Sequence, residues 1–448
     1  MLDSSRPPLK SRATNLILGG GVTGLAAGMS SGLPIYEAKS VAGGICASYY
    51  MKVGGTQRLD SPPADEEAYR FEVGGGHWIF GGDPLVHHFI EKAAPTAQYS
   101  RVSGVWFPDE KKHVPYPLQN HLRYLGPDLA SKALREMIAA PGGGWTTMEQ
   151  WLQSCFGKTL SEKFFGPFHE LYTAGLYRTI APQDDQKSPI DLARVIDGMV
   201  KETPPAGYNT TFRYPRRGLD ELVRNMAARC TVHYRKAVVR IDLPDRVVHF
   251  ADGTSEPYRA LVSTLPLNKT LEMAGLTVPQ PHDPHTSVLV LNVGGVKGAA
   301  CPQDHWLYHP NSRSGFHRVG FYSNVDPSFL PRSFRESHDR VSMYIERAYP
   351  GGQRPSAEEA SRHADSVVSE LKEWGFLDRP EVVDNTWIDV AYTWKTPGSK
   401  WREHAIKLLH EQGIFTIGRY ARWKFQGIAE SIADGFLAGV AINSESQR

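Results

Sequence analysis

The N-terminal pattern of apolar and glycine positions predicts a strand, a turn, a helix and a second strand. Residues 16–18 form a short apolar strand, an apolar helix opens at residues 25–27, and a second apolar run, residues 33–36, ends at Glu37. A GxGxxG motif lies between the first strand and the helix: Gly19, Gly21 and Gly24. Such glycines let backbone N–H groups approach a pyrophosphate, and an acid about 20 residues further on can bind ribose hydroxyls. The segment is therefore expected to bind a dinucleotide.

The rest of the chain reads as insertions into this nucleotide-binding unit. Apolar residues at three- and four-residue spacing predict helices over about 122–200, and alternating apolar residues predict strands over 231–266. A β-rich segment over 287–349 precedes a helix near 357–374. The chain then closes with a strand, a glycine loop and a long apolar helix. Strand–glycine–helix pieces at the start, middle and end indicate one domain assembled from separate segments.

Further glycine clusters favour FAD over a nicotinamide dinucleotide. Residues 42–44 follow the acid, residues 73–77 carry three glycines before His77, and residues 427–429 begin the last helix. Such clusters let backbone approach a large flat ring, and a helix N-terminus stabilises negative charge on it. We therefore expect an α/β fold whose Rossmann-like FAD-binding domain is built from discontinuous segments, with an inserted helical domain and an antiparallel β-sheet domain. The expected boundaries are 12–100, 205–275 and 405–448 for the FAD-binding domain, 101–204 for the mainly helical insertion and 276–404 for the β-rich substrate domain.

Composition narrows the class of protein. The 448 residues are 41% hydrophobic and 22% charged, as in globular proteins, and the formal net charge of +2 gives no reason to expect nucleic acid or a membrane as partner. The four cysteines lack CxxC spacing and are expected to be free thiols. No targeting segment is visible, so we expect a cytoplasmic protein. The sequence contains no HExxH motif and no clustered spacing of metal ligands, so we expect no metal site.

Several segments together resemble one enzyme family. GGGVTGLAAG, IYEAKSVAGG, VGGGHWIF, VPYPLQNHL, FRYPRRG, LVSTLP, HWLYHPNSRSGFHRVGFYSNVDP and IGRYARW follow in order along the chain. This series resembles the UDP-galactopyranose mutases, which share their FAD superfamily with the amine oxidases and protoporphyrinogen oxidase. The resemblance implies a redox-neutral isomerase that interconverts pyranose and furanose forms of a nucleotide sugar, by attack of reduced-flavin N5 on the anomeric carbon. It also implies NADH or NADPH as reductant, and a homodimer is possible.

The hairpin between residues 305 and 323 can be read by arithmetic. If its loop centres on Arg313, Tyr308 lies opposite Arg318, and Trp306 shares a strand face with Tyr308. A guanidinium beside a phenol can clamp a diphosphate, because arginine binds phosphate through two donors. The resemblance makes Tyr308 and Arg318 diphosphate contacts.

The resemblance also assigns the other site residues. His77, Arg318 and Arg419 are the expected catalytic residues, with His77 and Arg419 close to the flavin. The expected FAD contacts are Gly19, Gly21, Gly24, Glu37, Gly43, Gly44, Gly76, Val238, Arg419, Gly427 and Ile428. The expected substrate contacts are Tyr116, Gln119, Phe164, Arg194, Asn209, Trp306, Tyr308, Arg318 and Tyr392.

One departure from the mutase pattern leaves other functions open. Phe425 stands where the mutases carry a phosphate-binding tyrosine, so the chain fits a mutase for another nucleotide sugar nearly as well as one for UDP-galactose. The alternative is an FAD-dependent oxidoreductase of the amine oxidase or protoporphyrinogen oxidase type, which would need a hydrophobic tunnel in place of an arginine-lined cleft. A third reading is a flavin-binding protein without turnover.

Overall fold

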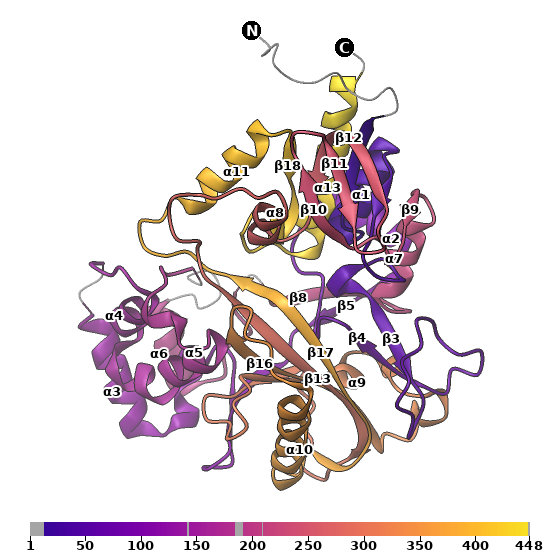
Figure 1. The fold of residues 1–448 in the computed structure, drawn as a ribbon. Helices are drawn as coiled ribbons and strands as arrows, with labels where there is room; N and C mark the ends of the chain where they lie inside the picture. Colours follow the sequence, from indigo (N-terminus) through magenta and orange to yellow (C-terminus); the bar gives the residue numbers. More distant parts are fainter. Residues whose placement is uncertain (1–12, 141–142, 184–190, 208, 447–448) are drawn as a thin grey trace.

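The computed structural model describes residues 13–140, 143–183, 191–207 and 209–446. The chain builds a nucleotide-binding region, a large, mainly antiparallel sheet and a cluster of helices, which lie around a shared centre (Figure 1). The predicted mixed α/β fold is confirmed. No helix in the described ranges combines the length and the apolar character that a membrane span requires.

The nucleotide-binding region is built on a parallel sheet with an antiparallel extension. Its strand order is β10-β11-β12-β1-β2-β9, and β18 pairs with β12. The strand–turn–helix–strand prediction is confirmed by β1, α1 and β2. The strands are β1 (Thr14–Leu18), β2 (Ile35–Tyr36), β9 (Val232–His233), β10 (Val238–Asp242), β11 (Val247–Phe250), β12 (Ser255–Ser263) and β18 (Ile414–Thr416).

Helices from distant parts of the sequence cover this sheet. They are α1 (Val22–Ser31), α2 (Pro84–Ala93), α7 (Leu219–Ala227), α8 (Leu267–Met273), α11 (Trp401–Glu411), α12 (Gly418–Ala421) and α13 (Ile428–Ser446). Helices α1 and α13 pack closely, because glycines of α13 face α1. A Cβ at Gly435 would lie 2.2 Å from the Thr23 carbonyl oxygen, and one at Gly439 would lie 2.0 Å from Ser30 Oγ. The two ends of the chain are therefore joined through this helix pair.

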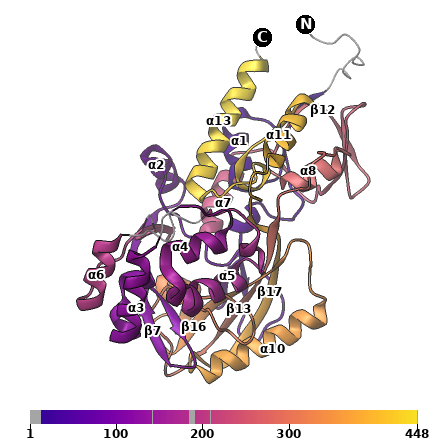
Figure 2. The same ribbon diagram turned by 90° about the vertical axis from the view of Figure 1, so that its left-hand side faces the viewer.

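The second sheet has the strand order β17-β13-β16-β15-β14-β6-β7. Helix α10 (Ala357–Glu373) lies along this part of the molecule (Figure 2) and confirms the helix predicted near 357–374. Residues 103–115, at the start of the range expected to be mainly helical, form two strands of this sheet before the chain enters the helices. The strands are β6 (Ser103–Phe107), β7 (Lys112–Pro115), β13 (His285–Lys297), β14 (Trp306–Tyr308), β15 (Arg318–Phe321), β16 (Arg340–Pro350) and β17 (Leu377–Thr393); a short helix, α9 (Tyr322–Val325), follows β15.

The helical cluster and two small sheets complete the molecule. The cluster contains α3 (Pro127–Ile138), α4 (Met148–Leu160), α5 (Gly166–Tyr172) and α6 (Leu192–Val200). A π-helical turn, Ser161–Phe165, joins α4 to α5. The small sheets pair β3 (Ser48–Met51) with β4 (Tyr69–Glu72), and β5 (Thr96–Ser100) with β8 (Thr211–Pro215). Strand β4 leads directly into the glycine loop that carries His77. The β3–β4 sheet therefore positions this loop at the centre of the molecule.

Candidate active site

A cavity of about 520 Å³ lies where the nucleotide-binding region, the second sheet and the helical cluster meet. Its walls come from segments far apart in the sequence: the loop after β1, the loop after β4, the π-helical turn and α5, the β14–β15 hairpin, β17 and the loop before α13. One end consists largely of glycine backbone, and the other is aromatic and cationic. The cavity therefore has two chemically different ends.

The glycine end fits the diphosphate and ribose of a dinucleotide. Helix α1 begins after Gly21, which carries no capping side chain, and a Cβ at Gly21 would meet no atom within 4 Å. The N–H groups of the first helical turn are thus open to an anion. By contrast, a Cβ at Gly24 would lie 2.0 Å from the carbonyl oxygen of Gly19, so this glycine permits the close turn rather than lining the cavity.

Glu37 holds the loop and faces the same space. Its carboxylate accepts hydrogen bonds from the Gly20 N–H at 2.7 Å and the Lys39 N–H at 2.8 Å. Each carboxylate oxygen has a second lone pair, so both remain able to accept from ribose hydroxyls. The donors of the glycine loop and this acceptor form a set that suits the adenosine half of FAD.

The loop after β4 is pressed against Tyr344 of β16. A Cβ at Gly76 would lie 2.1 Å from Tyr344 Oη, and a Cβ at Gly320 would lie 2.0 Å from Tyr344 Cζ. Only glycine therefore fits at these two positions beside this tyrosine. The contact fixes the backbone next to His77 at the centre of the cavity wall.

His77 is a neutral ring at physiological pH. Burial, followed by the positive charge of Arg419, lowers the pKa of His77 to about 4. Nδ1 lies 3.3 Å from the carbonyl oxygen of Gly75, to which it donates. Nε2 is consequently the acceptor nitrogen of the ring.

Arg318 lies at the other end of the cavity, in an ion pair with Glu346. Its Nη2 lies 2.7 Å from Glu346 Oε1 and its Nε 3.1 Å from Oε2. Burial would lower the pKa of Arg318, but the carboxylate of Glu346 and the surrounding tyrosines together raise it well above its usual value. The arginine therefore stays charged. Nη1 makes no hydrogen bond to any residue in the described ranges, which leaves that nitrogen for a ligand.

Tyrosines surround this ion pair. Tyr308 pairs with Arg318 across the hairpin, which confirms the register predicted by arithmetic, and both side chains line the cavity together with Trp306. Tyr392 Oη lies 3.5 Å from Arg318 Nη2. Burial, followed by the charge of Glu346, raises the pKa of Tyr392, so this phenol remains a hydrogen-bond donor.

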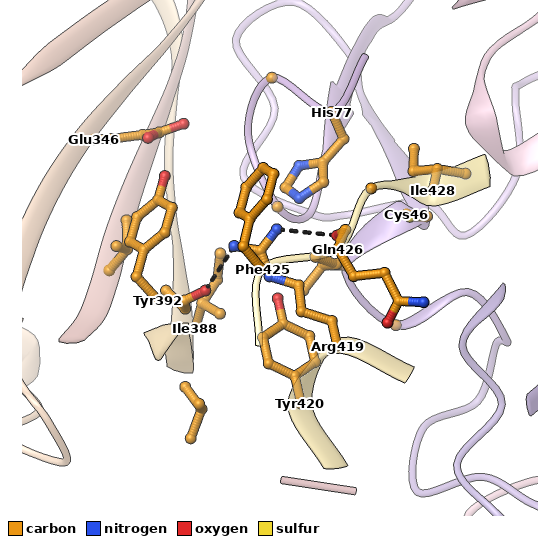
Figure 3. Close-up of a pocket in the computed structure, with 18 of the residues that line it drawn as sticks. Cys46, His77, Glu346, Ile388, Tyr392, Arg419, Tyr420, Phe425, Gln426 and Ile428 are labelled. Atoms are coloured by element: carbon orange, nitrogen blue, oxygen red, sulfur yellow. Dashed lines mark hydrogen bonds between the residues drawn. The ribbon is translucent and has the colours of Figure 1, made fainter. Parts of the chain in front are cut away.

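Arg419 is held by backbone carbonyl groups. Its Nη1 donates to the Gln426 carbonyl and its Nη2 to the Ala391 carbonyl, each at 3.3 Å (Figure 3). No carboxylate in the described part of the chain forms an ion pair with it. The ring of Phe425 covers its guanidinium at 4.9 Å, and Figure 3 shows this ring between Tyr392 and His77. Arg419 therefore keeps its positive charge uncompensated beside His77.

An aromatic wall from the helical cluster closes the far end. Phe164 and Phe168 stack with ring centroids 5.4 Å apart, and Phe168 and Tyr172 stack at 5.5 Å. Phe168 also meets Tyr308 edge to face at 5.2 Å. His169 Nδ1 donates to the Phe165 carbonyl at 2.7 Å, which orients its ring. Such a wall can stack a flat group of a ligand.

Most of the predicted site residues lie on this one cavity. They are Gly19, Gly21, Glu37, Gly43, Gly44, Gly76, His77, Tyr116, Phe164, Asn209, Trp306, Tyr308, Arg318, Tyr392, Arg419, Gly427 and Ile428. Asn209 is also bonded through Oδ1 to a buried arginine, Arg101.

Other predicted residues lie elsewhere. Arg194 is on α6, about half exposed, and pairs with Asp191 at 3.5 Å, because this helix packs inward through Val195 and Gly198 and leaves residue 194 on its outer side. Gln119 is fully buried, and Val238 is in β10 at the edge of its sheet. None of these three is among the residues that line the cavity.

Sequence reasoning missed Glu346 and most of the aromatic wall. The signal for the wall was present, because Phe164, Phe168 and Tyr172 recur at four-residue spacing on one helical face. Glu346 carried no comparable signal, since only the pairing of β15 with β16 places it opposite Arg318.

Comparison with solved structures supports this architecture. A crystal structure of reduced UDP-galactopyranose mutase is 20% identical, with a TM-score of 0.79, and the match covers 97% of this chain and 96% of that one. A putrescine oxidase bound to putrescine is 14% identical, with a TM-score of 0.61 and coverage of 96% and 99%. A fatty acid isomerase from P. acnes that produces CLA is 14% identical, with a TM-score of 0.56 and coverage of 96% and 98%. At these identities the likeness establishes the fold.

Sequence comparison identifies the family. A search of curated proteins found no significant match. The sequence profile of the flavin containing amine oxidoreductases, however, matches residues 26–289, which is more than half of the chain. The matched range includes Glu37 and the glycine clusters at residues 42–44 and 74–76, and it begins just after the GxGxxG motif. The chain belongs to the flavin-containing amine oxidoreductase family.

Proposed function

We propose that this protein is a reduced-FAD-dependent mutase that interconverts pyranose and furanose forms of a nucleotide sugar. One observation carries the proposal: Arg318 and Arg419, with Tyr308 and Tyr392, lie on the same cavity as the glycine loops. A sugar held between these two ends has its diphosphate near the guanidinium groups. The TM-score to the reduced UDP-galactopyranose mutase adds support, because it is the highest among the compared structures given above.

The two arginines stabilise a departing diphosphate in different ways. Glu346 holds one edge of Arg318, so that Nη1 is presented in a fixed direction. Arg419 supplies a charge that no described carboxylate neutralises, and a buried, water-poor wall strengthens its attraction to phosphate. The phenols of Tyr308 and Tyr392 donate hydrogen bonds to phosphate oxygens. Together these groups hold the leaving group close by, which favours its return to the sugar.

The glycine end of the cavity would bind the cofactor. Gly21, Glu37 and the α1 N-terminus would hold the adenosine diphosphate portion of FAD, and the loop at Gly76 and His77 would lie against its ring. When bound and reduced, the flavin supplies an electron-rich N5 for attack at the anomeric carbon. His77 is neutral and can accept a hydrogen bond at Nε2 without adding positive charge beside that nucleophile.

The second candidate is an FAD-dependent oxidoreductase of the amine oxidase or protoporphyrinogen oxidase type. The aromatic wall of Phe164, Phe168 and Tyr172 favours it, as does Phe425, because these rings would suit an apolar substrate. A putrescine oxidase shares the fold. This candidate uses the same glycine end but leaves the cationic groups without a phosphate to bind.

The test is incubation of the flavin-loaded protein with UDP-galactose and then with other nucleotide sugars, with and without dithionite. Chromatography measures the furanose product. We expect this product to form only when the flavin is reduced. Arg318→Lys should abolish most of the conversion, whereas Arg217→Gln, an exposed arginine paired with Glu221, should not change it. Oxidation of an amine or a carbon–carbon bond, with no conversion of any nucleotide sugar, would establish the second candidate instead.

A further inference from the structure

We propose that a second cavity, on the outer side of the β14–β15 hairpin, binds a small phosphorylated anion. This cavity of about 610 Å³ lies between the hairpin loop, the end of β16 and the first turns of α10. Its lining includes Arg313, Arg347, Arg354 and Arg362, and one carboxylate, that of Glu359. It shares no lining residue with the first cavity, so the inference is independent of the proposed function.

Arg347 is the centre of this basic cavity. It follows Glu346 on β16, and because successive side chains of a strand point to opposite faces, it points away from the first cavity. Its Nη1 donates to the Ser314 carbonyl at 3.3 Å and to His363 Nδ1 at 3.2 Å. Its guanidinium lies 5.0 Å from the ring of Tyr349. No carboxylate in the described ranges forms an ion pair with Arg347. Its partly buried positive charge is therefore available to bind an anion.

His363 lies beside Arg347 and can supply a further hydrogen-bond donor to an anion. Burial, followed by the charge of Arg347, lowers the pKa of His363 to about 4, so the ring is neutral at physiological pH. Since Nδ1 accepts from Arg347, the ring proton is on Nε2. A buried neutral histidine that orients an arginine and still holds one N–H suits recognition of phosphate oxygens.

The remaining charges leave the cavity positive. Arg354 is exposed and forms no ion pair with any described residue. Arg313 pairs with Glu373 and Arg362 with Glu358, but these pairs are solvent-exposed and therefore weak.

The one lining carboxylate is already engaged. Glu359 accepts a hydrogen bond from the Ser356 N–H at 2.7 Å, as part of the capping box of α10. This helix has 17 residues, and its first turns, which carry its positive end, line the same space.

The loop that forms the floor is fixed before any ligand binds. The buried carboxylate of Glu370 accepts from the Arg313 N–H and the Ser314 N–H, each at 2.9 Å, and from Ser312 Oγ at 3.2 Å. Ser314 Oγ also bonds Ser366 Oγ at 2.8 Å. These bonds satisfy the buried carboxylate beneath the loop. The arginines therefore project from a rigid frame, which lowers the entropic cost of binding.

The experiment is isothermal titration of the flavin-loaded protein with inorganic pyrophosphate. We compare wild type, Arg347→Gln/Arg354→Gln, and a control of equal charge change, Arg217→Gln/Arg379→Gln, whose arginines are exposed elsewhere. Two binding events are expected in wild type and control. The first variant should retain one event and weaken the other by at least ~10-fold, because it loses two charge-assisted contacts. Equal titrations for variant and control would overturn the proposal.

Further arms separate the possible failures. A single event in wild type that Arg347→Gln/Arg354→Gln removes would support this cavity while contradicting a diphosphate clamp at Arg318. If the double variant does not fold, as judged by circular dichroism, Arg354→Gln alone should weaken the event ~3-fold or more, since this exposed side chain has no structural partner. Pyrophosphate is a free anion; binding instead to vesicles rich in phosphatidylserine, lost in the double variant, would contradict a small-molecule ligand.

Discussion

At the scale of single residues, the two ion pairs on the β14–β15 hairpin make a direct comparison. Arg318–Glu346 is buried, with the Glu346 side chain 3% exposed, whereas in Arg313–Glu373 both side chains are more than half exposed. Breaking a buried pair leaves an uncompensated charge, while a surface pair is screened by water. The same pair of residue types therefore has different consequences at the two ends of one hairpin.

Glu346→Gln is expected to destabilise the protein by about 3–5 kcal/mol, and Glu373→Gln by less than about 1 kcal/mol. Urea unfolding followed by circular dichroism measures both. Similar losses in the two variants would contradict the role assigned to burial. Glu346 also positions Arg318, so Glu346→Gln should raise the Kd for UDP, and Glu373→Gln should leave it unchanged.

Glu72 is a fully buried carboxyl group that Tyr214 Oη and Ser48 Oγ contact. Burial raises the pKa of Glu72 from 4.5 to about 7, with Arg70 opposing the shift. The folded protein therefore binds the proton more tightly than the unfolded chain. The free energy of unfolding should fall as pH rises from about 4.5 to about 7, and then level off.

Glu72→Gln should remove this part of the pH dependence, because glutamine does not ionise. The difference in unfolding free energy between variant and wild type should grow by about 3 kcal/mol across that pH window, at 1.36 kcal/mol per unit. Urea titrations at several pH values provide the measurement, with Glu162→Gln, an exposed position on the helical cluster, as control. If the unfolding free energies of wild type and Glu72→Gln change with pH in parallel, the assigned role of Glu72 is wrong.

At the scale of elements, the contact between α1 and α13 supports the glycine end of the first cavity. Both helices begin at that cavity, and Gly435 allows their backbones to approach. Gly435→Ala should therefore lower stability by about 1–3 kcal/mol through overpacking and reduce the flavin content of the purified protein. Thermal melts and the ratio of absorbance at 280 nm and 450 nm give the two readouts. Leu437→Ala, on the exposed side of the same helix, should alter neither.

The hairpin shows how far the sequence alone can reach. Its register followed from a loop centred on Arg313, because residues of an antiparallel pair are related by reflection about the loop centre, and the Tyr308–Arg318 pairing is confirmed. The pairing of β15 with β16 could not be read in the same way. A helix, turns and a change of direction separate these strands, so no symmetry of the sequence places Glu346 opposite Arg318.

The helical cluster gives the converse case. The periodicity predicted helices there, and α3 to α6 lie within the predicted range. It could not predict which helix faces the cavity. Phe164 lines it, while Arg194 on α6 faces solvent, because the packing of α6 against α3 and the turn near Asn120 decides its orientation.

At the scale of the whole molecule, the nucleotide-binding region draws on the beginning, the middle and the end of the chain. β12 lies between β1 and β18, and α13 packs on α1. Glycine motifs in all three segments made this arrangement predictable, since each segment carried a strand–glycine–helix pattern. The relative placement of the inserted parts was not encoded in any local pattern.

Deletion of residues 414–448 should therefore abolish flavin binding, although the GxGxxG motif remains. The deletion removes β18 from the sheet and uncovers the apolar face of α1. Absorbance at 450 nm after purification in the presence of added FAD measures the effect. A protein that lacks only its last two residues should bind flavin as the full chain does. Retention of flavin by the larger deletion would mean that the N-terminal segment suffices.

The position of Tyr344 has a consequence for how such chains diverge. Its ring occupies the volume that side chains at residues 76 and 320 would need, one on the loop after β4 and the other in strand β15, which are far apart in sequence. A homologue that replaces either glycine can do so only if position 344 shrinks in the same lineage. These three positions should consequently covary across an alignment, and a lineage with a smaller residue at 344 would gain freedom to reshape the wall beside the flavin.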